Sequence, residues 1–273
     1  MIFQQHRNFR GDEQKNPKLV DRLARILARV HAMDVPIKRT GNWLFDCFDQ
    51  SLQLTKERFD IKKMIEEYDC QTFLKYDIEE ELDWLKKTVL SIDSPIAFTH
   101  IDFRGSNVMV TEPDDEIILC DFEYSSYGYR GIDFGTIFAE WNGRLWSDIH
   151  KVHDFPEDPI IRPFIESYIE ESIELKGKDF SEDKRNSLEN ILKEVKVFTL
   201  VSNMFFVVLS LRSNKSMRDP DAPYDKKSSM VNNELSMCFP IIYLDQIVFQ
   251  IFCDLFYKNY QHLKQLFRNQ SIF

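Results

Sequence analysis

The sequence predicts an α+β fold that is mostly helical and has one strand-rich segment near its centre. Apolar residues recur at helical spacing over most of the 273-residue chain. Between Pro95 and Phe122 they instead form short runs separated by a turn signal. The hydrophobic content of 43% indicates a globular protein, and no internal repeat is present, so we expect one domain over residues 1–273.

The first helix is expected to begin after Asn16, a favoured N-cap residue that Pro17 follows at the first helical position. We expect no strand-rich segment before it. A second helical pattern, "DIEEELDWLKKTVLSI", covers residues 77–92. Helical patterns return in four later segments, at 132–141, 161–175, 181–211 and 240–273.

The most apolar stretch, "VFTLVSNMFFVVLSL", covers residues 197–211 and contains Ser202 and Asn203. It is shorter than the roughly 20 residues of a membrane-spanning helix. A buried core helix is therefore favoured, and no transmembrane segment is expected. The polar segment 212–234 lacks periodicity and is predicted to be a mobile loop.

The strand-rich segment contains three β runs, "IAFTH", "NVMV" and "EIILCDF". The turn signal "EPDDE" separates the last two runs and predicts a small β-hairpin. This hairpin lies between two polar residues with metal-binding side chains, Asn107 and Asp121.

Composition excludes several kinds of function. With a net charge of −10, the chain offers no basic surface for nucleic acid or anionic lipid. Neither of the common Gly-rich nucleotide loops, GxGxxG and GxxxxGK(S/T), is present. The five cysteines are scattered without a CxxC pair and the N-terminus is polar, so we expect a reduced, cytoplasmic protein without a signal peptide.

The motif "HIDFRGSN", residues 100–107, sets Asp102 five residues before Asn107, and Asp121 follows at the end of the hairpin. Phosphoryl transfer from a nucleotide needs a carboxylate beside the acceptor hydroxyl and oxygen ligands for Mg²⁺. A protein-kinase-like site supplies these groups in this order, so Asp102 would accept the hydroxyl proton and the other two would bind the metal. His100 would brace the loop. The alternative is a hairpin flanked by solvated carboxylates and an Asx-turn.

Together, "HIDFRGSN" and "DFEYSSYGYRGIDFGTIFAEW" resemble the signatures of the choline/ethanolamine kinase family, as does the stretch from Val30 to Asp46. The resemblance covers nearly the whole chain, but only as that family's protein-kinase-like C-terminal lobe. It implies ATP- and Mg²⁺-dependent phosphorylation of an amino alcohol, choline or ethanolamine, in phospholipid head-group synthesis. The implied partners are this small molecule and ATP, with no nucleic acid, while a homodimer stays open.

The resemblance also assigns roles to individual residues. The candidate catalytic residues are Asp102, His100 and Arg104, and the candidate metal ligands are Asn107, Asp121 and Glu123. The candidate substrate-binding residues are Glu140, Tyr124, Phe206, Phe249 and Phe252, while Arg130 and Asp133 would stabilise the loop. Glu140 would lie close to the substrate ammonium.

Several positions depart from the family pattern. Arg104 stands where the family has Gln, Gly128 where it has Asn, and Thr136-Ile137 replaces Asn-His. Two Trp that hold the quaternary ammonium of the substrate correspond to Phe206 and Leu209. Because Phe binds cations less well than Trp and Leu has no aromatic face, we expect ethanolamine to be preferred over choline.

The family's N-terminal lobe, which covers the ATP phosphates and supplies a Lys, has no expected counterpart before Asn16. We therefore expect a chain truncated at its N-terminus or a relative that has lost this lobe, with little activity by itself. Three functions compete: an amino-alcohol kinase, a non-catalytic kinase-like binding protein and an aminoglycoside-type phosphotransferase. The segments "FAEW" and "EYSSYGYRG" count against the third, and retention of the three motif residues counts against the second.

Overall fold

The computed structural model describes residues 5–9, 11–39, 43–58, 66, 70–141, 155–213 and 246–273, which form the mostly helical α+β fold that the sequence predicts. The strands are β1 (Gln5–Asn8), β2 (Ile96–Thr99), β3 (Val108–Glu112), β4 (Ile117–Leu119) and β5 (Ser126–Tyr129). The helices are α1 (Pro17–Ala32), α2 (Trp43–Arg58), α4 (Gln71–Lys75), α5 (Ile78–Ile92), α6 (Gly131–Ala139), α7 (Asp158–Lys176), α8 (Lys178–Ser181), α9 (Leu188–Ser213) and α11 (Gln246–Asn269).

Two of the expected helices begin where the sequence places them, and an N-cap side chain starts each one. The Asn16 side chain accepts a hydrogen bond from the Lys18 N–H at 3.1 Å at the start of α1. At the start of α5, Asp77 accepts from the N–H groups of Glu79 and Glu80. Such bonds satisfy donors that have no partner inside the helix, so the cap residue fixes its first turn.

One of the later helices is interrupted relative to its sequence-based bounds. A 3-10 turn at Lys184–Asn186 interrupts the helix expected over residues 181–211, and α9 begins after it at Leu188. The Asp183 carboxylate caps this turn by accepting the Arg185 N–H at 2.9 Å. A capping carboxylate at this point ends one element and begins another.

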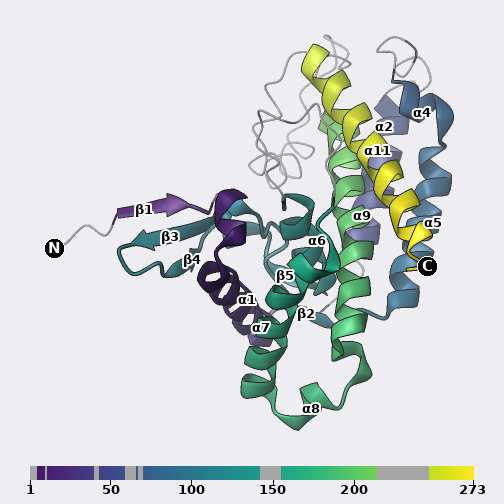
Figure 1. Ribbon diagram of the computed structural model, residues 1–273. Helices are drawn as coiled ribbons and strands as arrows, with labels where there is room; N and C mark the ends of the chain where they lie inside the picture. Colours follow the sequence, from purple (N-terminus) through teal and green to yellow (C-terminus); the bar gives the residue numbers. More distant parts are fainter. Residues whose placement is uncertain are drawn as a thin grey trace.

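In the described residues the strands form two antiparallel sheets. The predicted hairpin of β3 and β4 is extended by β1, which pairs with the other edge of β3, and β2 pairs with β5. The three-stranded sheet projects away from the long helices α9 and α11 (Figure 1). The strand β1 corrects the expectation of no strand-rich segment before Asn16. Its short polar sequence acquires hydrogen bonds only from a distant partner, which local propensity does not reveal.

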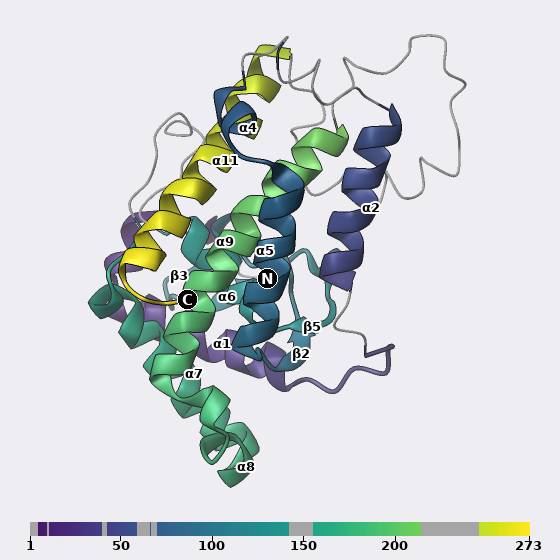
Figure 2. The ribbon, with the colours of Figure 1, turned by 90° about the vertical axis from the view of Figure 1, so that its right-hand side faces the viewer.

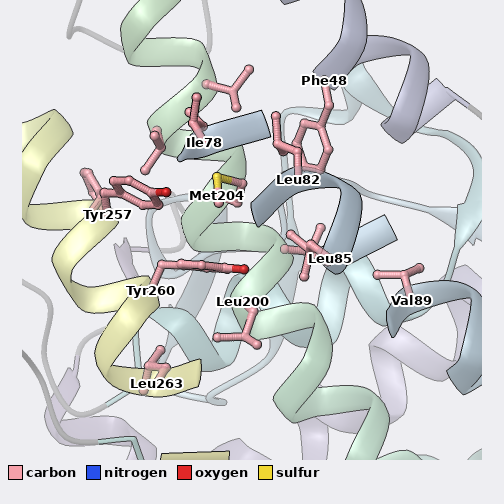
Figure 3. Close-up of a cluster of buried hydrophobic side chains, with 14 of the residues drawn as sticks. Phe48, Ile78, Leu82, Leu85, Val89, Leu200, Met204, Tyr257, Tyr260 and Leu263 are labelled. Atoms are coloured by element: carbon pink, nitrogen blue, oxygen red, sulfur yellow. The ribbon is translucent and has the colours of Figure 1, made fainter. Parts of the chain in front are cut away.

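Buried side chains in the described residues gather in two large clusters, and α9 contributes to both. The first lies between α5, α9 and α11 and includes Leu85, Leu200 and Tyr260 (Figure 3). The second packs α1 against α6 and α7 and includes Leu23 and Phe134. Figure 2 shows α9 running between α5 and α11 and continuing towards α7. Because one helix serves both clusters, they belong to a continuous interior.

The most apolar stretch of the sequence lies inside α9. Val197, Leu200 and Met204 are buried there, which confirms the predicted core helix. In the part of the chain that the structure describes, no helix has the length and apolar character needed to cross a membrane. The predicted mobile loop, 212–234, begins with the last two residues of α9 and otherwise lies outside the described residues.

Helix α6 approaches α9 so closely that two of its positions require glycine. A Cβ atom on Gly135 would lie 2.1 Å from the carbonyl oxygen of Phe198, and one on Gly131 would lie 2.2 Å from its ring carbon Cδ2. Real Cβ atoms do not approach other atoms so closely. The contact fixes α6, and with it Asp133, against the central helix of the fold.

Candidate active site

The candidate catalytic loop runs from His100 to Asn107 and joins β2 to β3. Asp102 is buried in it. The Asn107 Nδ2 group donates to the Asp102 Oδ2 atom at 2.7 Å and to the Asp102 carbonyl oxygen at 3.0 Å. The amide nitrogen is thus used within the loop, and the amide oxygen is the atom with which Asn107 could bind a metal.

Opposing effects act on the carboxyl group of Asp102. Burial raises its pKa above the usual value, and the negative charge of Asp121 acts in the same direction. The Arg104 guanidinium, with Nε 3.1 Å from Asp102 Oδ1, and the hydrogen bond from Asn107 favour the charged form. The result is a carboxylate with increased affinity for a proton, which suits a general base.

Asp121 follows β4, at the same open end of the antiparallel hairpin as the loop that precedes β3. The Cys120 N–H donates to the Asn107 carbonyl oxygen at 3.0 Å, so the backbone brings the two predicted metal ligands together. The influence of Asp121 on the pKa of Asp102 indicates the same proximity. The structure therefore assembles Asp102, Asn107 and Asp121 in one place.

Asp133, on α6, holds the beginning of the loop. Its Oδ2 atom accepts the His100 N–H at 2.8 Å, and its Oδ1 atom accepts the Ile101 N–H at 2.7 Å. Ile101 has a φ of 72°, an unfavourable conformation for a β-branched residue. The two hydrogen bonds to a charged acceptor stabilise this strained backbone directly before Asp102.

The His100 ring braces the loop against the segment that carries Asp121. Its Nε2 donates to the Cys120 carbonyl oxygen at 2.9 Å, and the ring packs on Phe122 with centroids 4.6 Å apart. These contacts fit the bracing role expected for His100. A direct catalytic role for His100 stays a prediction.

Three further predicted residues lie around the loop. The Glu140 Oε2 atom accepts the Gly105 N–H at 3.1 Å, so this carboxylate faces the catalytic loop from the end of α6. Glu123 and Tyr124 follow Asp121 in a 3-10 turn, where Glu123 is exposed and Tyr124 is half-buried. Their roles in metal and substrate binding stay predictions.

Phe206, one of the aromatic residues predicted to hold the substrate, takes part in the packing between helices. Phe206 on α9 stacks on Phe256 of α11, with centroids 5.0 Å apart and planes at 16°. One face of the Phe206 ring is therefore covered. Phe249 and Phe252 lie in α11, but their side chains, like that of Leu209, are outside the described part of the structure.

Arg130 joins the start of α6 to α9 by a buried ion pair. Its Nη2 atom lies 3.0 Å from Glu194 Oε2, and Nη1 donates to Asn186 Oδ1 at 2.5 Å. The Ser94 hydroxyl also donates to Glu194. This network joins the start of α6 to α9, and the sequence did not reveal Glu194 as the partner of Arg130. The role of Arg130 in stabilising the loop stays a prediction.

The sequence also did not reveal His31, which contacts the carboxylate that holds the loop. Its Nε2 lies 3.1 Å from Asp133 Oδ2, and its Nδ1 lies 2.9 Å from the Tyr168 hydroxyl. His31 lies within the stretch from Val30 to Asp46 that resembles the family pattern, and near the end of the amphipathic pattern of α1. Neither signal showed that its side chain is buried against Asp133.

The residues present fit a Mg²⁺ ion held jointly with phosphate groups. Among the described residues, no group of three or more His, Cys, Asp or Glu side chains could hold a metal by itself. Mg²⁺ in phosphotransfer sites commonly takes one or two protein ligands and completes its shell with phosphate oxygens and water. The exposed Asp121 carboxylate and the Asn107 amide oxygen are hard donors of that kind.

Comparison with known proteins assigns the chain to one family. Residues 2–259 match the choline/ethanolamine kinase family model. The chain is 29% identical over 221 residues to choline/ethanolamine kinase of Homo sapiens, covering 75% of this chain and 53% of that protein. It is 26% identical over 200 residues to ethanolamine kinase 1 of Mus musculus, covering 72% and 53%. The chain thus spans about half the length of these relatives.

Solved structures share the fold at low sequence identity. Choline kinase from Cryptosporidium parvum superposes over 98% of this chain and 70% of its own, with a TM-score of 0.65 and 15% identity. An ethanolamine kinase from Plasmodium vivax superposes over 88% and 64%, with a TM-score of 0.57 and 20% identity. The predicted protein-kinase-like fold is confirmed by these likenesses.

Proposed function

Because the chain belongs to the choline/ethanolamine kinase family, we propose that it transfers the γ-phosphoryl group of ATP to the hydroxyl group of an amino alcohol, as a step in phospholipid head-group synthesis. The observation that carries this proposal is the assembly of Asp102, Asn107 and Asp121 around one loop. An aminoglycoside-type enzyme could share this loop, and the family match supports an amino alcohol as the acceptor instead.

In the proposed reaction, Asp102 orients the acceptor hydroxyl and takes its proton. Burial raises the pKa of this carboxyl, which strengthens it as a base. Arg104 and Asn107 hold the carboxylate in position through the ion pair and the hydrogen bond. A bound Mg²⁺ would neutralise charge on the transferring phosphoryl group, with Asn107 and Asp121 as its protein ligands.

We expect ethanolamine to bind better than choline at this site. Its ammonium carries N–H donors that a carboxylate such as Glu140 can accept through charge-assisted hydrogen bonds. Choline has no such donors and depends on aromatic faces. The stacking of Phe206 on Phe256 supports this preference, because it uses one of the aromatic faces that a cage would need.

Nucleotide binding tests the metal assignment independently of turnover. Isothermal titration of the protein with ATP should show binding that depends on Mg²⁺. Asp121→Ala should weaken it at least about tenfold because a metal ligand is lost, whereas Asp102→Asn should leave it unchanged. The Asn side chain can still accept the hydrogen bond from Asn107. Equal ATP affinity in wild type and Asp121→Ala would remove the assignment of the metal site.

A further inference from the structure

His31 lies where three helices meet behind the catalytic loop. It lies in the last turn of α1, and its side chain contacts Tyr168 of α7 and Asp133 of α6. Its backbone carbonyl oxygen also accepts a hydrogen bond from Lys176 Nζ at 3.2 Å. The side chain is fully enclosed, with 1% of its surface exposed. Both its ring and its backbone are therefore fixed by the same neighbouring helix, α7.

The contacts define which nitrogen of His31 carries the proton. Asp133 already accepts two backbone N–H bonds, so it is an acceptor and His31 Nε2–H donates to it. The Tyr168 hydroxyl then donates to the unprotonated Nδ1. Burial lowers the pKa of His31, which favours this neutral form. One tautomer satisfies all three groups.

We propose that His31 is a positioning residue for the catalytic loop, acting through Asp133, in the reaction proposed above. The Oδ2 atom of Asp133 that faces His31 is the same atom that accepts the His100 N–H. The other oxygen holds Ile101, in its strained conformation, directly before Asp102. A donor from His31 sets the orientation of this carboxylate and hence the position of the base. Small displacements of a catalytic group reduce turnover strongly.

Two substitutions separate this role from a purely structural one. In His31→Gln, the side-chain amide nitrogen can take the place of Nε2 and donate to Asp133, while the contact with Tyr168 is lost. In His31→Asn, the side-chain oxygen can take the place of Nδ1 and accept from Tyr168, while the donor to Asp133 is lost. The side chains of Asn and Gln are no larger than that of His, so either amide can be accommodated.

The expected results differ for the two variants. His31→Asn should lower kcat about tenfold or more with little change in KM, and the His100 and Ile101 amides should exchange with solvent faster. His31→Gln and the control Tyr168→Phe should keep wild-type kcat and slow exchange at both amides. Equal behaviour of His31→Asn and His31→Gln in both measurements would overturn the proposal.

A measurement on the wild-type protein keeps the proposal testable if a variant does not fold. Nitrogen chemical shifts of the His31 ring should show Nε2 protonated and Nδ1 unprotonated. The opposite tautomer would overturn the proposal, because it cannot donate to Asp133. Absence of phosphotransfer would contradict the proposed function alone, since the tautomer and the amide exchange do not depend on turnover.

Discussion

His31 stays neutral in the folded protein against the pull of a neighbouring carboxylate. Burial lowers its pKa below the ordinary value of 6.5, although the hydrogen bond and the charge of Asp133 favour the protonated form. Arg130 and Lys176 lie close enough to disfavour a further positive charge. Because the pKa of His31 differs between the folded and unfolded states, the free energy of unfolding depends on pH.

The sign of this dependence follows from the lowered pKa. Between pH 6.5 and the folded-state pKa, the unfolded chain binds a proton at His31 that the folded chain does not, so the free energy of unfolding falls as pH falls. Above pH 6.5 the contribution is constant. Urea unfolding of wild type and His31→Gln between pH 5 and 7.5 should show the steeper loss in wild type, by up to about 1.4 kcal/mol per pH unit. Parallel curves would contradict this account.

A second prediction at the residue scale concerns Phe206 and the relative affinity for ethanolamine and choline. Its stacking on Phe256 leaves less aromatic surface for a quaternary ammonium. Cation–π contributions of roughly 0.5–2 kcal/mol correspond to about a tenfold difference in affinity. Calorimetric titration should therefore give a lower Kd for ethanolamine than for choline. A clear preference for choline would show that other aromatic side chains form the cage.

At the scale of elements, the contact of α6 with α9 connects the core to the site. Gly135 faces the Phe198 backbone, which cannot move without disturbing α9, whereas Gly131 faces only the side-chain ring of Phe198. Helix α6 carries Asp133 between these glycines. Packing at this crossing thus fixes the carboxylate that holds the catalytic loop.

Gly135→Ala tests this contact, because two effects of opposite sign compete. Helix propensity favours Ala over Gly by about 1 kcal/mol. Overpacking against the backbone costs about 1–3 kcal/mol or more, and a Cβ atom 2.1 Å from a carbonyl oxygen is a severe clash. We expect net destabilisation in urea unfolding, larger than for the matched variant Gly131→Ala. A Gly135→Ala protein as stable as wild type would contradict the close crossing.

At the scale of the whole molecule, local signals predicted the elements that local chemistry determines. Asn16 and Asp77 mark helix starts because a cap acts on its own first turn. Helix α2 carries a recognisable pattern of Leu44, Phe48 and Leu52, all buried at four-residue spacing, yet it is absent from the expected helices. Strands β1 and β5 depend on distant partners and left no clear signal.

The candidate site likewise contains residues that local patterns predict and residues that depend on distant partners. Asp102, Asn107 and Asp121 could be predicted because their spacing around a hairpin is itself a chemical signature. The residue pairs that support the loop could not be predicted, because His31 lies 102 residues from Asp133 in the sequence and Arg130 lies 64 residues from Glu194. Such contacts arise from helix packing, which no local pattern in a single sequence encodes.

The most direct test of the central claim is phosphoryl transfer itself. Phosphorus NMR of the protein with Mg²⁺, ATP and ethanolamine, followed over a long incubation, should show formation of the phosphorylated amino alcohol at the low rate expected of this chain by itself. Asp102→Asn should abolish it, because the base is lost while the loop hydrogen bond from Asn107 can persist. The account would be contradicted if Asp102→Asn transferred the phosphoryl group at the wild-type rate. It would also be contradicted if the wild-type protein bound Mg²⁺ and ATP yet formed no product, and that outcome would favour a binding protein.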